Sequence, residues 1–134
     1  MKIIIKLVCI LLCLSMLFTV TVYATVVGPR FTYINTINSE ISINEQTGLV
    51  SCKADLYANG SLTIKVACYL ERITINGLVT EKTWNRSSIG ILRFNETKGV
   101  EAGYKYRFFI SGEIIDSNGS VIETFSKSCY YDYR

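Results

Sequence analysis

The sequence predicts an all-β protein, folded as a two-sheet antiparallel sandwich of seven to eight strands and preceded by a signal-peptide helix. Three observations lead to this fold class. Apolar and polar residues alternate along several short runs, turn-forming residues recur roughly every 10–15 residues, and no stretch beyond the N-terminal segment has helical periodicity. Short strands at such spacing favour a sandwich, with a small barrel as the alternative.

The N-terminal segment has the three parts of a secretory signal peptide. Met1–Lys6 is basic, Leu7–Val22 is apolar, and the following Tyr23 and Ala24 end the segment on a small residue. We therefore expect residues 1–24 to be a signal peptide that is cleaved after Ala24. The alternative is an uncleaved anchor, because the apolar run is long enough to span a bilayer. Cleavage predicts a secreted protein with no stable membrane insertion and one β-sandwich domain at residues 25–134.

Two short strands are expected ahead of the central part of the chain. Residues 31–37 form the first strand, and residues 40–44 form the second, with Ile41 and Ile43 directed inward. The polar residues 45–48 make the turn that follows.

The stretch from Leu49 to Arg72 contains two alternating runs, which Ala58-Asn59-Gly60-Ser61 joins. Because Asn-Gly is the strongest short turn signal between such runs, the stretch is expected to be a hairpin. Beyond Arg72 the alternation slips by one residue, which suggests a β-bulge. The side chains expected on the buried face are Val50, Cys52, Ala54 and Leu56 in the first run, and Leu62, Ile64, Val66, Cys68 and Leu70 in the second.

Each of these two runs thus carries one inward cysteine. Cys9 and Cys13 would leave with the signal peptide, so Cys52, Cys68 and Cys129 would remain. Disulfides persist outside the cell, and we favour a Cys52–Cys68 bridge, which would stabilise the fold by about 3 kcal/mol. Two reduced buried cysteines, or a bridge to Cys129, are the alternatives that spacing leaves open.

The rest of the chain predicts four more strands. The expected ranges are 78–84, 87–94, 104–115 and 121–133, separated by turns that contain Asn-Gly or other polar residues. The longest clean alternation runs from Tyr104 to Ile114.

The composition argues against most enzyme classes and against nucleic acid as a partner. The formal net charge of +3 falls to +1 without Lys2 and Lys6, and no cluster of Lys or Arg remains. The chain has no histidine, which removes the common nucleophilic triads and the commonest zinc ligand. It also lacks a glycine-rich phosphate loop in the required strand–loop–helix context. We expect no metal, no cofactor and no enzyme activity.

Two carboxylate pairs are the only route to acid–base catalysis. Glu96 with Glu101, or Asp116 with Glu123, flank loops and would serve a secreted hydrolase if they converged. Acids at loops and strand edges are far more often solvated surface groups, so the hydrolase is the weakest hypothesis.

Four aromatic residues are candidates for a binding surface. Tyr69, Trp84, Phe109 and Tyr130 fall at positions where the alternation directs side chains outward. Exposed aromatic rings on a flat sheet face bind glycans or protein partners. The alternative is that these rings belong to the core or cover its edge.

The segment Gly103-Tyr104-Lys105-Tyr106-Arg107-Phe108 resembles the penultimate strand of immunoglobulin-like and fibronectin type III-like sandwiches. In those folds an early tyrosine forms the tyrosine corner, so the resemblance implies this part for Tyr104 or Tyr106. The usual second disulfide cysteine, two residues beyond that tyrosine, is absent, because Tyr106 and Phe108 stand at the two possible positions. If Cys52 is the first cysteine of such a fold, the resemblance implies that its partner has moved to Cys68 and that the strands on either side of Asn59-Gly60 lie in opposite sheets.

The mature chain as a whole is similar to small secreted proteins of Gram-positive, clostridia-type bacteria, a group without an established activity. The resemblance implies an immunoglobulin-like sandwich and export, and no catalytic role. The matching pieces are Pro29–Ile34, Gly48–Cys52, Leu70–Arg72 with Gly77 and Trp84, and Gly103–Arg107.

The sequence therefore predicts a secreted, non-catalytic β-sandwich that acts as a binding or interaction module at or outside the cell surface. Its expected partner is a cell-surface protein or glycan. A module that binds glycans through the four aromatic residues is the first alternative, and a hydrolase that uses a carboxylate pair is the second.

Overall fold

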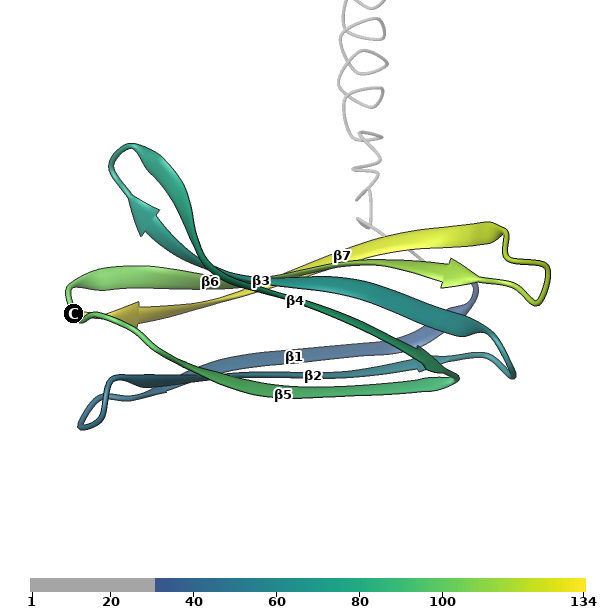
Figure 1. Ribbon diagram of the computed structural model, residues 1–134, viewed down its shortest axis with the longest axis horizontal. Coiled ribbons are helices and arrows are strands. Elements are labelled where there is room, and N and C mark those ends of the chain that lie inside the picture. The colour runs from purple at the N-terminus through teal and green to yellow at the C-terminus, as the bar shows by residue number, and fades with distance from the viewer. Residues whose placement is uncertain (1–30) are drawn as a thin grey trace, which may run out of the picture. The chain divides into compact units, whose positions relative to one another are not determined.

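The computed structural model describes residues 31–134, which form seven β-strands and no helix (Figure 1). The expected signal peptide, its cleavage after Ala24, and Cys9 and Cys13 lie outside the described residues. Within residues 31–134 no helix has the length and apolar character needed to cross a membrane. The strands are β1 (Ile34–Asn44), β2 (Leu49–Ala58), β3 (Thr63–Thr74), β4 (Gly77–Ile89), β5 (Ile91–Gly99), β6 (Tyr104–Ile115) and β7 (Val121–Tyr133).

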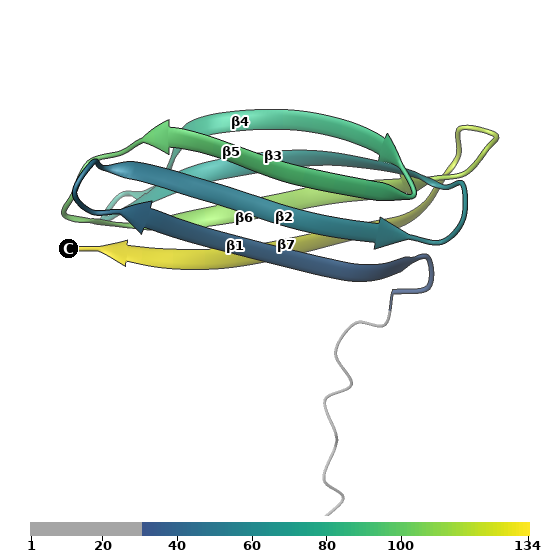
Figure 2. The same cartoon turned by 90° about the horizontal axis from the view of Figure 1, so that it is seen from below.

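The strands form two antiparallel sheets that lie face to face. One sheet has the order β1-β2-β5 and the other has the order β4-β3-β6-β7. Seen from below, the three-stranded sheet lies in front of the four-stranded one (Figure 2). The predicted all-β fold with two antiparallel sheets is thereby confirmed, and its seven strands lie within the expected seven to eight.

The expected hairpin from Leu49 to Arg72 is wrong, because its two runs belong to different sheets, which is the arrangement that the resemblance to immunoglobulin-like sandwiches implies. β2 pairs with β1 and β5, whereas β3 pairs with β4 and β6. The Asn59-Gly60 segment, where Gly60 has a positive φ of 58°, carries the chain from one sheet to the other. A local turn signal predicts that the chain changes direction, and it leaves open which strands pair afterwards.

Other strand boundaries also differ from the sequence prediction. The two strands expected at 31–37 and 40–44 are one strand, β1, which has a register shift between Ile34 and Thr36. The strands expected at 78–84 and 87–94 are β4 and β5, and the chain passes between the sheets at Gly90, whose φ is +69°. A left-handed φ favours glycine, so this one residue allows the switch.

The core lies between the sheets and contains the predicted inward residues of β2 and β3. The side chains of Val50, Cys52, Ala54, Leu56, Ile64, Val66, Cys68 and Leu70 are all buried, and Leu62 is partly buried. Strict alternation explains this result, since every second side chain of a strand points to the same face. The predicted slip is present as a register shift between Leu70 and Glu71, where β3 pairs with β4.

Three aromatic rings connect the two sheets through the core. Phe94 of β5 stacks on Phe108 of β6 at a centroid distance of 5.6 Å, and Trp84 of β4 packs edge-on against Phe94 at 5.4 Å. Phe108 is fully buried. Phe108 stands two residues after Tyr106, where the expected fold class usually has its second cysteine.

Tyr106 ties the loop before β6 to the core. Its hydroxyl donates to the carbonyl oxygen of Glu101 at 2.7 Å and accepts from the backbone N–H of Glu101 at 3.1 Å. The side chain is 1% exposed, and burial raises the pKa of Tyr106 above its ordinary value. Of the two tyrosines considered from sequence, Tyr106 is thus the one whose hydroxyl bonds back to the upstream backbone.

We expect Tyr106→Phe to lower the free energy of unfolding by about 1–3 kcal/mol, because it leaves two backbone groups without their partner. Tyr104→Phe is the matched control. Its ring is half-buried under the Arg72 guanidinium, and its hydroxyl makes no hydrogen bond within residues 31–134. Urea titration of both variants checks this, and equal losses would contradict a structural role for the Tyr106 hydroxyl.

The β3–β4 hairpin extends beyond the rest of its sheet and rises from it (Figure 1). Ile75 at its tip is 102% exposed, and Leu78 and Val79 are about half exposed. Arg72 at the base of the hairpin binds Glu81 at 2.9 Å and Glu101 at 3.1 Å. These ion pairs hold the base of the hairpin against the loop that precedes β6.

Candidate functional site

The outer face of the four-stranded sheet gathers aromatic and polar side chains from three strands. No described strand lies over this face (Figure 1). The antiparallel register of β3 and β6 places three pairs side by side, namely Tyr69 with Phe109, Ala67 with Ser111, and Lys65 with Glu113. Asn85 of β4 lies next to Ala67 on the other side. Residues far apart in the sequence therefore share one surface.

Tyr69 and Phe109 form an aromatic wall on this face. Their ring centroids are 5.9 Å apart and their planes differ by 28°. The Arg107 guanidinium carbon lies over the Phe109 ring, 4.9 Å from its centroid. Arg107 precedes Phe109 by two residues and Ser111 follows it by two, so the three side chains emerge in line on one face. Arg107 covers one side of the Phe109 ring, and Tyr69 packs against the same ring from β3.

Glu71 fixes the position of Arg107. The Nε of Arg107 donates to a carboxylate oxygen of Glu71 at 2.6 Å, and Glu71 is only 8% exposed. This hydrogen bond is the main reason that the pKa of Arg107 lies above its ordinary value. A buried carboxylate requires such a partner, and the pair in turn holds the guanidinium against the aromatic wall.

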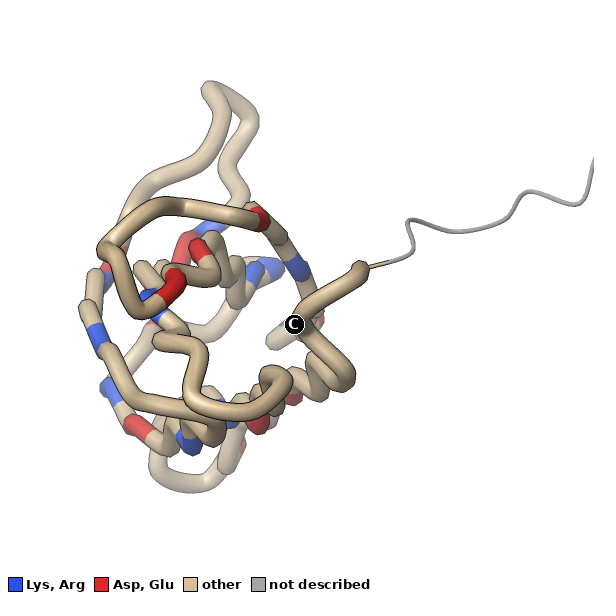
Figure 3. Tube along the Cα trace, turned by 90° about the vertical axis from the view of Figure 1, so that its right-hand side faces the viewer, with Lys and Arg blue, Asp and Glu red and all other residues tan. Residues whose placement is uncertain are grey.

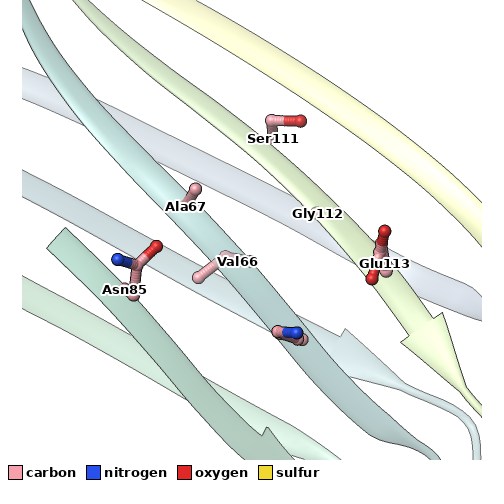
Figure 4. Close-up of a pocket in the computed structure, with 7 residues that line it drawn as sticks. Val66, Ala67, Asn85, Ser111, Gly112 and Glu113 are labelled. Atoms are coloured by element: carbon pink, nitrogen blue, oxygen red, sulfur yellow. The ribbon is translucent and has the colours of Figure 1, made fainter. Parts of the chain in front are cut away.

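A hollow of about 200 Å³ lies beside the aromatic wall (Figure 4). Figure 4 shows Asn85 and Glu113 on opposite sides of it, with Ala67 and Ser111 between them. The hollow exists because the sheet has small residues in its middle, where larger neighbours surround them. Its lining consists of Lys65, Val66, Ala67, Asn85, Ser111, Gly112 and Glu113.

Gly112 keeps the sheet thin below the hollow. Its missing side chain would point inward, where an added Cβ would lie 2.2 Å from Cζ of Phe125. Phe125 is the cross-strand partner of Gly112 on β7, and its ring covers the glycine from the core side. Such aromatic cover of a glycine secures the register of neighbouring strands.

Four polar side chains border the hollow without protein partners. Lys65, Asn85, Ser111 and Glu113 form no side-chain hydrogen bond or ion pair with any other residue of the range 31–134. Their groups are an ammonium, an amide, a hydroxyl and a carboxylate, which together supply both donors and acceptors. The two charges oppose each other on neighbouring strands, so the rim is close to neutral.

The four aromatic residues predicted to form a binding surface lie in different places in the structure. Tyr69 and Phe109 come together, half-buried, on the outer face. Tyr130 is 51% exposed, lies next to Arg107 on β7, and has the Lys105 ammonium 5.2 Å from its ring centroid.

The outward position expected for Trp84 is wrong. Trp84 is 8% exposed and packs on Phe94 in the core. It pairs with the inward Cys68 across β3 and β4, and directly opposite residues share a face, so Trp84 also points inward.

The expected Cys52–Cys68 disulfide is also wrong, since both residues are free thiols, as is Cys129. Cys52 and Cys68 lie on β2 and β3, in opposite sheets, and both are fully buried. Facing sheets pack about 10 Å apart, whereas a disulfide needs Cβ atoms within about 4.5 Å, so only directly facing positions are bridged. The alternative that spacing left open, two reduced buried cysteines, describes the structure.

We expect the folded domain to protect two of the three thiols that residues 31–134 contain. Burial raises the pKa of both Cys52 and Cys68 to about 12, so neither is a thiolate at neutral pH, whereas Cys129 is only half-buried. A disulfide-exchange reagent at pH 8 should label Cys129 first in the folded protein. After the protein is unfolded in the absence of reductant, the same reagent should label all three cysteines. A single reactive thiol in the unfolded chain would show that the other two are bridged.

The carboxylates proposed for acid–base catalysis each have another partner. Glu96 pairs with Arg86, and Glu101 pairs with Arg72. Asp116 accepts hydrogen bonds at 2.9 Å from the backbone N–H groups of Asn118 and Ser120 within its own turn.

Glu123 holds the start of the described chain. Its carboxylate accepts the backbone N–H groups of Thr32, Tyr33 and Ile34 at 2.6–3.1 Å. Within residues 31–134 no group of three or more potential metal ligands comes together.

Two other hollows differ from the one beside the aromatic wall. A hollow of about 240 Å³ lies on the outer face of the three-stranded sheet, between β1 and β2, and no aromatic residue lines it. A larger one, of about 400 Å³, lies under the β3–β4 hairpin, where Glu81 and Glu101 neutralise Arg72. Charges of both signs are interspersed over the domain (Figure 3). No aromatic side chain lines any of these three hollows, and the first is the one that lies next to the Tyr69–Phe109 pair.

Comparison with protein-family models found no match to this chain, and comparison with curated proteins found none.

Proposed function

We propose that the protein is a non-catalytic binding module that works at or outside the cell surface, with the outer face of the four-stranded sheet as its binding surface. One observation carries this proposal. An aromatic wall, Tyr69 with Phe109, adjoins a hollow whose four polar side chains have no partner within the described residues. Unpartnered polar groups next to apolar rings on an uncovered face are what a ligand surface requires.

The N-terminal sequence supports export, because its basic, apolar and small-residue parts follow the order of a signal peptide. The resemblance to small secreted proteins of clostridia-type bacteria supports the same location. The partners found for Glu96, Glu101, Asp116 and Glu123 support a non-catalytic role, since each carboxylate already has a structural task.

The finer fold type is part of the proposal. We assign the domain to the immunoglobulin-like and fibronectin type III-like sandwiches. The three-plus-four division of the strands and the Tyr106 hydroxyl bonded back to Glu101 support this assignment. In such folds either the loops or an open sheet face carries the binding site, and here the open face has the suitable groups.

Retention on bacterial cell envelopes tests the proposed function. The chain expressed from Thr25 is incubated with envelopes of a Gram-positive bacterium, and bound protein is measured after washing. Ser111→Trp fills the hollow from the central strand β6. Ser51→Trp is the matched control, because Ser51 occupies a central strand, β2, on the outer face of the other sheet.

We expect the wild type and Ser51→Trp to be retained and Ser111→Trp to be lost. Equal retention of both variants would move the binding surface away from this face. If the wild type is not retained at all, the binding function itself is contradicted. Ile75→Asp, at the exposed hairpin tip, reports in the same assay whether that tip takes part.

A further inference from the structure

We infer that the hollow beside the aromatic wall is a subsite for one neutral sugar ring of a glycan. The inference rests on the proposed binding function and adds the chemical class of the ligand. Three features of the described residues carry it: the position of the aromatic wall, the composition of the polar rim, and the size of the hollow.

The aromatic wall borders one end of the hollow. Arg107 lies over the Phe109 ring, and its backbone position is on the side of Phe109 away from Ser111. Tyr69 and Phe109 stand one outward residue pair along β3 and β6 from Ala67 and Ser111, which line the hollow. Tyr69 extends the wall to the neighbouring strand at an interplanar angle of 28°. The C–H groups on one side of a pyranose ring pack against such a surface, as apolar groups do on aromatic rings generally.

The polar rim matches the hydroxyl groups of a sugar. Each hydroxyl both donates and accepts, and the rim offers donors from Lys65 and Asn85 and acceptors from Glu113 and Asn85, with Ser111 able to do either. One ammonium and one carboxylate leave the rim without net charge. The carboxylate of Glu113 would repel a strongly anionic ligand, and the ammonium of Lys65 would repel a strongly cationic one. The rim therefore favours a neutral ligand.

The hollow has room for a single ring. Its volume of about 200 Å³ equals the volume of roughly six or seven liquid water molecules. The hollow is open on a sheet face, so the ring can belong to a longer chain whose neighbouring units lie over β4 or β7. Tyr130 of β7, which is half exposed and pairs with Arg107, is a further aromatic residue on this sheet.

The hollow on the opposite sheet supplies the internal contrast. It has a similar volume, about 240 Å³, and similar polar groups from Asn38, Glu40, Lys53 and Asp55. It lies beside a single aromatic residue, Tyr57, which stands two residues after Asp55 on the outer face of β2, whereas the first hollow lies beside the pair of Tyr69 and Phe109. Comparison of the two hollows therefore tests whether binding depends on the aromatic pair or on polar surface groups in general.

Direct titration tests the ligand class. The probes are neutral tetrasaccharides of glucose and of N-acetylglucosamine, with a tetrasaccharide of galacturonic acid as the charged comparison. Binding to the chain expressed from Thr25 is followed by the backbone amide shifts of the ¹⁵N-labelled protein. We expect at least one neutral probe to shift residues 65–69 and 109–113 and to leave residues 51–55 unchanged.

Variants then assign the contacts. Phe109→Leu keeps an apolar side chain but removes the aromatic ring, and is expected to weaken binding roughly tenfold. Phe109→Tyr keeps the aromatic ring and is expected to bind the probe as the wild type does. Asn85→Ala is expected to weaken binding roughly five- to tenfold through lost hydrogen bonds. Ser51→Trp on the other sheet should bind as the wild type does. Unchanged amide spectra away from each substitution confirm that the fold is intact.

The outcomes separate this inference from the proposed function. If envelopes retain the wild type and lose Ser111→Trp, but no neutral probe binds and protease treatment of the envelopes abolishes retention, the partner is a protein and the sugar inference is wrong. If periodate oxidation of envelope glycans abolishes retention and a neutral probe shifts the expected residues, the inference holds. Preference for the charged probe would also overturn it.

Discussion

Above pH 9 the free energy of unfolding is expected to fall by about 2.7 kcal/mol for each pH unit, because two buried thiols resist ionisation. Burial raises the pKa of Cys52 and of Cys68 from 9.0 to about 12. Between these values the unfolded chain has lost both protons and the folded chain keeps them. The unfolded state then binds fewer protons than the native state, so stability falls as the pH rises. Below pH 9 the full contribution is present.

Urea titrations at intervals from pH 8 to pH 10.5 measure this slope. The double variant Cys52→Ala with Cys68→Ala is expected to be less stable at pH 8, because it leaves cavities, but to lose stability less steeply as the pH rises. Cys129→Ala should reduce the slope less than the double variant does, since burial also raises the pKa of Cys129 but the side chain is only half-buried. Tyrosines titrate in every variant and so cancel in the comparison. Equal slopes in wild type and the double variant would refute the assignment to Cys52 and Cys68.

Phe108→Ala is expected to lower the free energy of unfolding by about 3–5 kcal/mol. Phe108 is fully buried and stacks on Phe94 of the opposite sheet, and Trp84 packs edge-on against Phe94. Removing the ring opens a cavity at the contact between the sheets and deletes the aromatic pair. A domain of this size has a total stability of about 5–15 kcal/mol, so the loss is a large part of it.

The neighbouring residue supplies the control. Phe109→Ala removes the same number of atoms from the outer face and is expected to cost about 1 kcal/mol, the worth of its pairing with Tyr69. If Phe108→Ala does not fold, Phe108→Leu takes its place in the comparison with Phe109→Ala. Its expected loss of stability lies between the losses of these two alanine variants. Urea midpoints decide the question, and similar losses at positions 108 and 109 would contradict the assignment of the two faces.

The contrast between these two neighbours illustrates what local patterning predicts well. Alternation along a strand depends only on the pleat of the backbone, so the inward residues of β2 and β3 and the long alternation of β6 were predictable. The predictions that failed concern relations between strands. Trp84 points inward because it opposes Cys68, and β2 and β3 do not pair, although Asn59-Gly60 resembles a hairpin turn.

The candidate site depends on the same kind of relation. Tyr69 and Phe109 were predictable as outward residues, but nothing in their neighbouring sequence indicates that they lie side by side. Lys65, Asn85, Ser111 and Glu113 were missed, because single polar residues on alternating strands have no motif. The one local signal was the run of small residues Ser111 and Gly112 within an otherwise bulky strand, which indicates a place where the surface is lower.

By itself the sequence determined the fold class, the turns, and which side of most strands faces the core. These features follow from short-range physics: the two-residue period of the strand and the φ preferences of turn residues. Only the tertiary structure decided that the cysteines remain thiols, that Trp84 is buried, and that an aromatic wall adjoins a polar hollow. These depend on strand order and register, which the whole core sets through the packing of both sheets.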